Sequence, residues 1–230
     1  FAGAIPVPVE VGSDHTIDPD AIAGSITPKT RAIMPTQLNG RTSDMAAIQS
    51  IADQYGLDIY EDAAQALGSK FKGQYAGTFG KAACISFYPA KILGCLGDGG
   101  LVLTSDREIY DKLLLLRDHG RANDGDISLW GFNTRLDNLQ AAFLNFQFDN
   151  YDQVIKRRRE IAAQYQEFLK DVDQIQLPPE PDANSDYFDV YQNYEIEAQQ
   201  RDKLKAFLAE NGIGTLIQWG GKAVHQFTKL

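Results

Sequence analysis

Polar side chains that could do chemistry occur in three short segments of this sequence. The segments read Tyr-Glu-Asp-Ala-Ala-Gln at residues 60–65, Ile-Ser-Phe-Tyr-Pro-Ala-Lys at residues 85–91 and Trp-Gly-Phe-Asn-Thr-Arg-Leu at residues 130–136. Asp62 and Lys91 follow predicted strands, and in a parallel sheet the carboxyl ends of the strands border the ligand crevice. We therefore expect this carboxylate and this amine to converge on one site.

Each of these residues also has a simpler explanation. An aspartate after a strand often caps the next helix, and an asparagine before a helix often does the same. A lysine in a loop is usually a solvated surface residue, and a serine on a strand usually bonds to its own backbone. The combination favours a shared site, because the simpler explanations do not require these residue types to occur together.

An amine and a carboxylate in one crevice are the pair that a pyridine cofactor needs. The amine of Lys91 can form an imine with the cofactor's aldehyde, and the carboxylate of Asp62 can keep the ring nitrogen protonated. The protonated ring then takes up electrons from a substrate carbanion. Ser86, five residues before Lys91, could donate a hydrogen bond to a phosphate group.

The apolar pattern predicts the elements that must position these residues. Over the first two-thirds of the chain, strands are predicted at residues 31–35, 57–60, 83–87 and 100–104, and helices at 45–55 and 106–117. Such alternation predicts an α/β fold with a mainly parallel central sheet. Ser43 or Asp44 is available to cap the first helix, and Gly56 ends it.

The pattern changes in the last third of the chain. After a helix that starts near Asp137, it predicts a long helix at 151–169, a proline-rich break at 177–181, a strand at 191–196, a helix at 201–210 and a strand at 214–217. We therefore expect a large-domain core over residues 1–150. Residues 151–230 are expected to form a long linking helix and part of a smaller C-terminal α/β domain.

Bulk composition argues against several classes of function. The net charge of −9 argues against a surface that binds nucleic acid, and no apolar run reaches the ~18 residues that a membrane-spanning helix needs. Two cysteines, Cys84 and Cys95, indicate reduced thiols in the cytoplasm rather than a disulfide framework. His15 and His119 have no metal-ligand spacing with each other or with the cysteines, so no metal site is expected.

Taken together, the three segments resemble the DegT/DnrJ/EryC1/StrS family of sugar aminotransferases. This family is a branch of the fold-type-I, aspartate-aminotransferase-like enzymes that use pyridoxal 5′-phosphate (PLP). The similarity covers nearly the whole chain and includes the segments at residues 26–33, 97–100 and 117–120. The order and spacing of the segments carry the resemblance, which implies a fold-type-I PLP-binding core over residues 1–150.

The resemblance also implies that parts of the family's sequence pattern are missing here. The upstream glycine-threonine phosphate loop and a ring-stacking aromatic residue are absent, and so is the rest of the small domain. We therefore expect this chain to be a fragment that lacks N-terminal and C-terminal parts.

The family's roles can be carried over to matching positions. Lys91 matches the lysine that binds the cofactor and moves a proton between the donor's Cα and the cofactor's C4′. Asp62 matches the acid paired with the pyridine nitrogen, and Gln65 matches a residue near the ring hydroxyl. Ser86 matches a phosphate ligand. Asn133 matches a residue that reaches the phosphate of the partner subunit's cofactor, which implies a homodimer with shared active sites.

The implied activity is transfer of an amino group, with glutamate as donor, onto a keto-sugar linked to a nucleotide. The segment at residues 218–225 differs from the commoner His-Tyr-Pro pattern, but His225 still fits a phosphate-proximal, substrate-binding position. One alternative is PLP-dependent sugar dehydration, in which a histidine replaces the lysine, so Lys91 argues against it. Another alternative is a non-catalytic sensor or interaction protein on the same fold.

Overall fold

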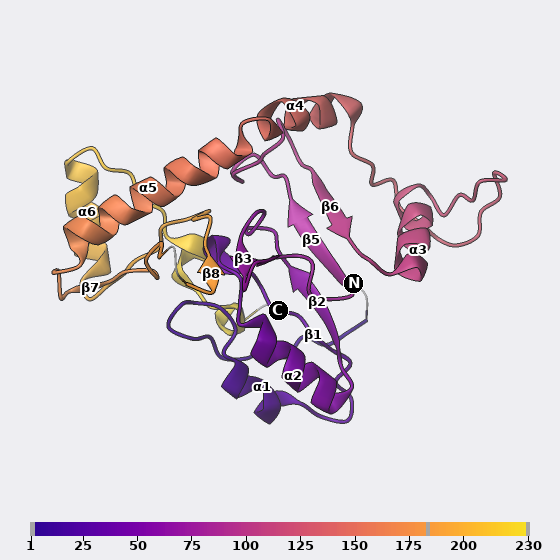
Figure 1. The fold of residues 1–230 in the computed structure, drawn as a ribbon, viewed down its shortest axis with the longest axis horizontal. Helices are drawn as coiled ribbons and strands as arrows, with labels where there is room; N and C mark the ends of the chain where they lie inside the picture. The colour runs from indigo at the N-terminus through magenta and orange to yellow at the C-terminus, as the bar shows by residue number, and fades with distance from the viewer. Residues whose placement is uncertain (1–2, 183–184, 229–230) are drawn as a thin grey trace.

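The computed structural model describes residues 3–182 and 185–228. At its centre is a four-stranded sheet (Figure 1). In spatial order its strands are β1 (Ala32–Ile33), β2 (Asp58–Asp62), β5 (Ala82–Ser86) and β6 (Gly100–Leu103). The first three run parallel, and β6 is antiparallel to β5. The expectation of an α/β fold with a mainly parallel sheet is confirmed.

Helices surround this sheet. Those of the described chain are α1 (Pro19–Ser25), α2 (Met45–Tyr55), α3 (Arg107–Arg117), α4 (Asn138–Phe148), α5 (Tyr151–Leu169) and α6 (Arg201–Glu210). Figure 1 shows α1 and α2 side by side next to β1, whereas α4 and the long α5 lead away from the upper end of the sheet. α3 and the segment that follows it extend to the right of β6.

The local signals that predict α2 are present in the structure. The carboxylate of Asp44 accepts a hydrogen bond from the backbone N–H of Ala47 at 3.0 Å, which caps the first turn. Gly56 ends the helix in a left-handed conformation, with φ of +65°. Ile48, on the buried face of α2, is fully buried in one core cluster with Ile59 of β2, so α2 supports the strand that carries the candidate carboxylate.

A second core cluster joins the loop after β5 to α5. Phe87, Leu93 and Cys95 from that loop are buried together with Tyr151 and Ile155 of α5. The first two turns of α5 and the loop that carries the candidate lysine therefore share one core cluster.

Short strands join segments that are far apart in the sequence. β3 (Lys70–Phe71) pairs with β4 (Gln74–Tyr75) and with β8 (Tyr187–Phe188), both antiparallel. β7 (Ile175–Gln176) pairs with β9 (Glu197–Ala198), beside α6. Residues on both sides of position 150 thus share one small sheet, and the division into domains after that position stays a prediction.

Two of the expected strands are wrong. Residues 191–196 are irregular, because Tyr191 has a left-handed backbone (φ +51°) and its neighbours bond to the turn at residues 39–40. Residues 214–217 are irregular as well, and the side chain of Leu216 is 86% exposed. Neither segment therefore pairs with another strand of the described chain.

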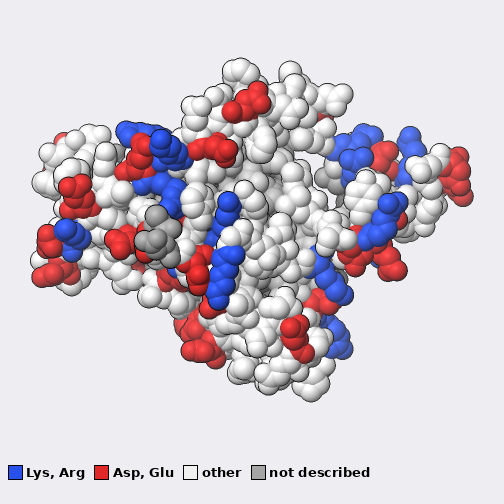
Figure 2. Space-filling view, viewed as in Figure 1, with Lys and Arg blue, Asp and Glu red and all other residues white. Residues whose placement is uncertain are grey.

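On the face seen in Figure 2, basic side chains lie beside acidic ones. Within residues 3–182 and 185–228, no helix is both long and apolar enough to cross a membrane. Cys84 is exposed, Cys95 is buried, and both are free thiols.

Candidate active site

Asp62 lies at the carboxyl end of β2, in the middle of the sheet. Its Cα pairs with that of Cys84 on β5, and its backbone N–H donates to Pro35 O at 3.0 Å on the other side. One carboxylate oxygen, Oδ1, accepts a hydrogen bond from the N–H of Ala64 at 3.1 Å. That bond caps a turn and not the helix that the simpler explanation of this aspartate expects, and it uses only one of the two oxygens.

The neighbouring Glu61 points to the opposite face of the strand and fixes the end of β2 in place. Its side chain is only 2% exposed. The carboxylate accepts hydrogen bonds from Gln37 Nε2 and from the backbone N–H groups of Gly77, Phe79 and Gly80, at 2.7–3.0 Å. Because hydrogen bonds to a charged acceptor are roughly twice as strong as neutral ones, this buried carboxylate holds the strand end rigidly.

Lys91 follows a turn after β5. Its backbone N–H donates to Tyr88 O at 2.8 Å, which closes the turn. Desolvation by burial lowers the pKa of Lys91 below its usual value, and the Asp62 carboxylate opposes this by raising it. Burial, and after it the same carboxylate, raises the pKa of the Cys84 thiol. Asp62 and Lys91, 29 residues apart in the sequence, therefore lie in one electrostatic environment.

Ser86 and Gln65 lie at the same end of the sheet. Ser86 is the last residue of β5, and its Oγ accepts a hydrogen bond from the N–H of Tyr88 at 3.2 Å. Gln65 follows β2, and its Oε1 accepts from the N–H of Asn39 at 2.8 Å. Each side chain is thereby fixed to a nearby backbone turn by one accepted hydrogen bond.

The four residues fit a PLP site by the chemistry of the groups that they leave unpaired. Among the described residues, none supplies a hydrogen bond or salt bridge to Asp62 Oδ2, to Gln65 Nε2, to the Ser86 hydroxyl hydrogen or to Lys91 Nζ. These groups are an acceptor for a protonated ring nitrogen, two donors for a ring hydroxyl and a phosphate, and an amine for the aldehyde. The assigned roles stay predictions.

The structure does not bring the other two predicted residues to this place. Asn133 lies on the segment between α3 and α4, where its Oδ1 accepts a hydrogen bond from Arg135 Nη2 at 2.8 Å. Figure 1 shows that this segment extends away from the sheet. His225 lies in a short 3-10 helix, η3 (Val224–Gln226), and its side chain is exposed. The part of the chain that is described links neither side chain to Lys91, so both roles stay predictions.

Sequence reasoning missed two residues that hold this site. Gln192 contacts the backbone on both sides of Lys91 through its side-chain amide. Asn39 has a left-handed backbone (φ +56°) and bonds to Gln65. The Asn-Gly pair at residues 39–40 was recognisable as a turn, but nothing in one sequence indicates that Gln192, about a hundred positions after Lys91, contacts the lysine loop.

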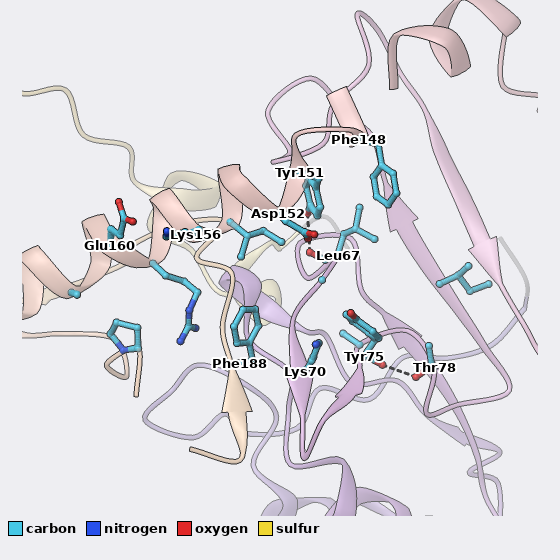
Figure 3. Close-up of a pocket in the computed structure, with 17 residues that line it drawn as sticks. Leu67, Lys70, Tyr75, Thr78, Phe148, Tyr151, Asp152, Lys156, Glu160 and Phe188 are labelled. Atoms are coloured by element: carbon cyan, nitrogen blue, oxygen red, sulfur yellow. Dashed lines mark hydrogen bonds between the residues drawn. The ribbon is translucent and has the colours of Figure 1, made fainter. Parts of the chain in front are cut away.

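A separate groove of about 780 Å³ runs along the first turns of α5 (Figure 3). Leu67, Tyr75, Phe148, Tyr151 and Phe188 line it. In Figure 3 the hydroxyl of Tyr151 bonds to the backbone carbonyl of Leu67, at 2.8 Å. None of the four site residues lines this groove, so the candidate site rests on the side chains around Lys91 and not on the groove.

A comparison with protein-family models settles which family this arrangement comes from. The model of the DegT/DnrJ/EryC1/StrS aminotransferase family matches residues 1–228. This chain belongs to that family. The recognition of the family from the three segments is thus confirmed.

Relatives of this DegT/DnrJ/EryC1/StrS chain include a Streptomyces venezuelae dTDP-3-amino-3,4,6-trideoxy-alpha-D-glucose transaminase. It is 41% identical over 94% of this chain and 57% of its own length. A Geobacillus stearothermophilus "pleiotropic regulatory protein" is also 41% identical, over 95% of this chain and 59% of its own. The chain therefore spans under two-thirds of the length of these relatives.

Solved structures of the family share this fold. The crystal structure of S. venezuelae DesV in complex with a ketimine intermediate superposes with a TM-score of 0.93 at 40% identity, over 99% of this chain and 60% of that one. A Brucella abortus DegT/DnrJ/EryC1/StrS aminotransferase superposes with a TM-score of 0.90 at 36% identity, over 99% and 62% of the two chains. The expectation of a PLP aminotransferase fold is confirmed.

Proposed function

We propose that the protein containing this chain uses PLP to transfer an amino group, with glutamate as donor, to a keto-sugar linked to a nucleotide. The observation that carries the proposal is the set of four groups, on Asp62, Gln65, Ser86 and Lys91, that no described residue pairs and that match what PLP requires. Two relatives from different organisms support the substrate class. They are named as a dTDP-sugar transaminase and as a UDP-N-acetyl-3-dehydro-alpha-D-glucosamine 3-aminotransferase, the second being 38% identical. Two free thiols support a cytoplasmic location.

When bound, PLP supplies an electron sink that stabilises the carbanion formed at the donor's Cα. Asp62 would accept a hydrogen bond from the ring nitrogen and so keep the proton there. Gln65 Nε2 would donate to the ring hydroxyl, and Ser86 would donate to the phosphate. These three side chains would orient the cofactor, and each is already fixed to the backbone by one hydrogen bond.

Lys91 has two tasks in this mechanism. Its amine would hold the cofactor covalently before substrate arrives, and once free it would take the proton from the donor's Cα as a general base. Both tasks require the neutral amine, and burial lowers the pKa of Lys91, which makes that form more abundant near neutral pH. In the second half-reaction Lys91 would deliver a proton in the opposite sense, to the former carbonyl carbon of the sugar.

The cofactor's absorption spectrum tests the proposed activity in the full-length protein. With PLP bound to Lys91, we expect a visible band that bleaches on addition of glutamate and returns when a nucleotide-linked keto-sugar is added. Labelled glutamate then identifies which sugar of a panel receives nitrogen. A band that forms but responds to no amino donor would refute transamination. That outcome would support the alternative of a non-catalytic regulator, which a relative named as a sensory transduction protein, 42% identical, keeps open.

We further propose that the protein is a homodimer in which the segment between α3 and α4 reaches the partner's site. Large apolar side chains are exposed there, including Trp130 at 96% and, on α4, Leu139 and Phe146 at 74% and 71%. An apolar surface of this kind favours a protein partner. The side chain of Asn133 has a fixed orientation, because Arg135 donates hydrogen bonds both to it and to Asp118.

A mixture of two inactive variants tests the shared site. In a homodimer, Lys91→Ala subunits lack the amine, and Asn133→Asp subunits place a carboxylate against the partner's phosphate. A hybrid dimer then has one doubly damaged site and one intact site. With random exchange, half of the dimers are hybrids, so activity should recover to about a quarter of wild type. If hybrids form, as native mass spectrometry can verify, and activity stays at the level of the parents, the shared-site proposal is wrong.

A further inference from the structure

The backbone on both sides of Lys91 is held by a single side chain from the C-terminal half of the chain. Oε1 of Gln192 accepts a hydrogen bond from the N–H of Ile92 at 2.9 Å, and its Nε2 donates to the carbonyl oxygen of Ala90, also at 2.9 Å. The primary amide of one glutamine thus pairs with the main chain as a neighbouring strand would. Both bonds fall on the residues directly next to the lysine.

The backbone that carries Gln192 is itself held by several contacts. Nη1 of Arg158, on α5, donates to the carbonyl oxygens of Tyr191 and Gln192 at 2.9 and 3.3 Å. Gly40 lies so close that a Cβ there would be only 2.7 Å from the backbone nitrogen of Gln192. Asn193 Nδ2 also donates to Asn39 Oδ1 at 2.9 Å. The backbone around Gln192 is therefore held in place on two sides, by α5 and by the turn at residues 39–40.

The position of Lys91 depends on these backbone hydrogen bonds, because its amine forms none to the described residues. Lys91 Nζ has no hydrogen bond or salt bridge to any described residue. Its position is set by the backbone of the turn at residues 88–91 and by the two bonds from Gln192. Gln140 holds the same loop at a more distant point, where its Oε1 accepts from the N–H of Leu96 at 2.9 Å. That contact is five residues beyond the lysine.

We propose that Gln192 is a positioning residue that fixes the direction of the Lys91 amine, an inference that rests on the proposed function. It acts through the backbone of Ala90 and Ile92, to which its side-chain amide bonds. Since a general base must be held within hydrogen-bond reach of the proton it takes, a small displacement of the reacting amine slows proton transfer strongly. Loss of Gln192 should therefore slow the chemical step and leave substrate binding almost unchanged.

The experiment compares Gln192→Met with Gln140→Met in the full-length protein. Methionine keeps the length of the side chain and removes both hydrogen bonds. In Gln192→Met we expect kcat to fall at least tenfold, roughly the cost of misplacing a catalytic group, with KM for both substrates within about threefold of wild type. Gln140→Met removes one tie to the same loop and should keep kcat within about threefold of wild type.

A second readout does not depend on activity. In the cofactor-free protein, amide hydrogen exchange of a peptide covering residues 90–93 should speed up at least tenfold in Gln192→Met, because the Ile92 N–H loses its acceptor. Gln140→Met should leave that peptide unchanged and expose the Leu96 amide instead. If Gln192→Met fails to fold, Gln192→Glu takes its place, since it keeps the acceptor for Ile92 but cannot donate to Ala90. It should then lower kcat with little change in the exchange of the Ile92 amide.

The outcomes separate this inference from the proposed function. If wild type shows no transamination, the proposed function fails, whereas the exchange data still test whether Gln192 holds the loop. If wild type is active and the folded Gln192 variant keeps kcat within threefold, positioning by Gln192 is overturned. The same holds if Gln140→Met slows kcat as much as Gln192→Met, because general loosening of the loop then accounts for the loss.

Discussion

Lys91→Ala in the full-length protein is expected to leave no measurable transamination while the fold remains intact. The substitution removes the only group proposed to bind the cofactor covalently and to move the proton. Lys91→Arg should be equally inactive, because a guanidinium stays protonated and cannot form the imine. Activity assays and circular dichroism of both variants would check this expectation.

Borohydride reduction identifies the attached lysine independently of turnover. Reduction of the cofactor-loaded wild type should label the peptide that contains Lys91. Lys70 and Lys81 serve as internal controls, since Lys70 Nζ lies over the ring of Tyr75 at 4.5 Å and Lys81 Nζ bonds to Asp58 at 2.8 Å. A label on either of these lysines would refute the assignment of Lys91.

Asp62→Asn should lower kcat at least a hundredfold with little effect on stability. The asparagine carbonyl can still accept from the N–H of Ala64, so the turn is kept. The neutral amide, however, cannot hold the charge of the ring nitrogen. Losing one charge-assisted hydrogen bond at a site of developing charge costs about 3 kcal/mol, which corresponds to a factor of a hundred or more. Steady-state kinetics and thermal unfolding of the same preparation separate the two effects.

The same substitution should shift the titration of Lys91 in the cofactor-free protein. The Asp62 carboxylate raises the pKa of Lys91 against the effect of burial, so replacing it with a neutral amide should lower that pKa further. The pH midpoint for chemical labelling of Lys91 should therefore move to lower pH. Asp44→Asn is a matched control, because Asp44 also caps a turn but lies at the start of α2.

Near wild-type turnover in Asp62→Asn would mean that Asp62 only caps its turn.

Much of the fold follows from local signals that a single sequence contains. The bounds of α2 and α5 agree with the predicted ranges 45–55 and 151–169. For α2 the reason is that a capping aspartate and a terminal glycine act within a few positions of the helix, and for α5 it is the spacing of the apolar residues along the helix. The convergence of Asp62 and Lys91 was also predictable, because parallel strands bring their carboxyl ends to one edge of a sheet.

What the sequence could not predict depends on contacts between distant segments. Residues 191–196 have the composition of a strand, yet Tyr191 takes a left-handed conformation because its neighbours bond to the turn at residues 39–40. The antiparallel direction of β6 is likewise decided by pairing and not by composition. Gln192 is the clearest case, since a lone glutamine has no local feature that indicates a partner 100 residues earlier.

The contact between Gln192 and the lysine loop also determines when, during protein synthesis, the loop can gain its support. The ribosome adds Lys91 about a hundred residues before the glutamine that holds its neighbours in place. At roughly 5–20 residues per second, that gap lasts on the order of 5–20 s. During this interval the nascent chain has the reactive amine but not its support. With the function and the role of Gln192 proposed above, we expect capture of the cofactor in a productive geometry to wait until the segment around residue 192 has left the ribosome and docked.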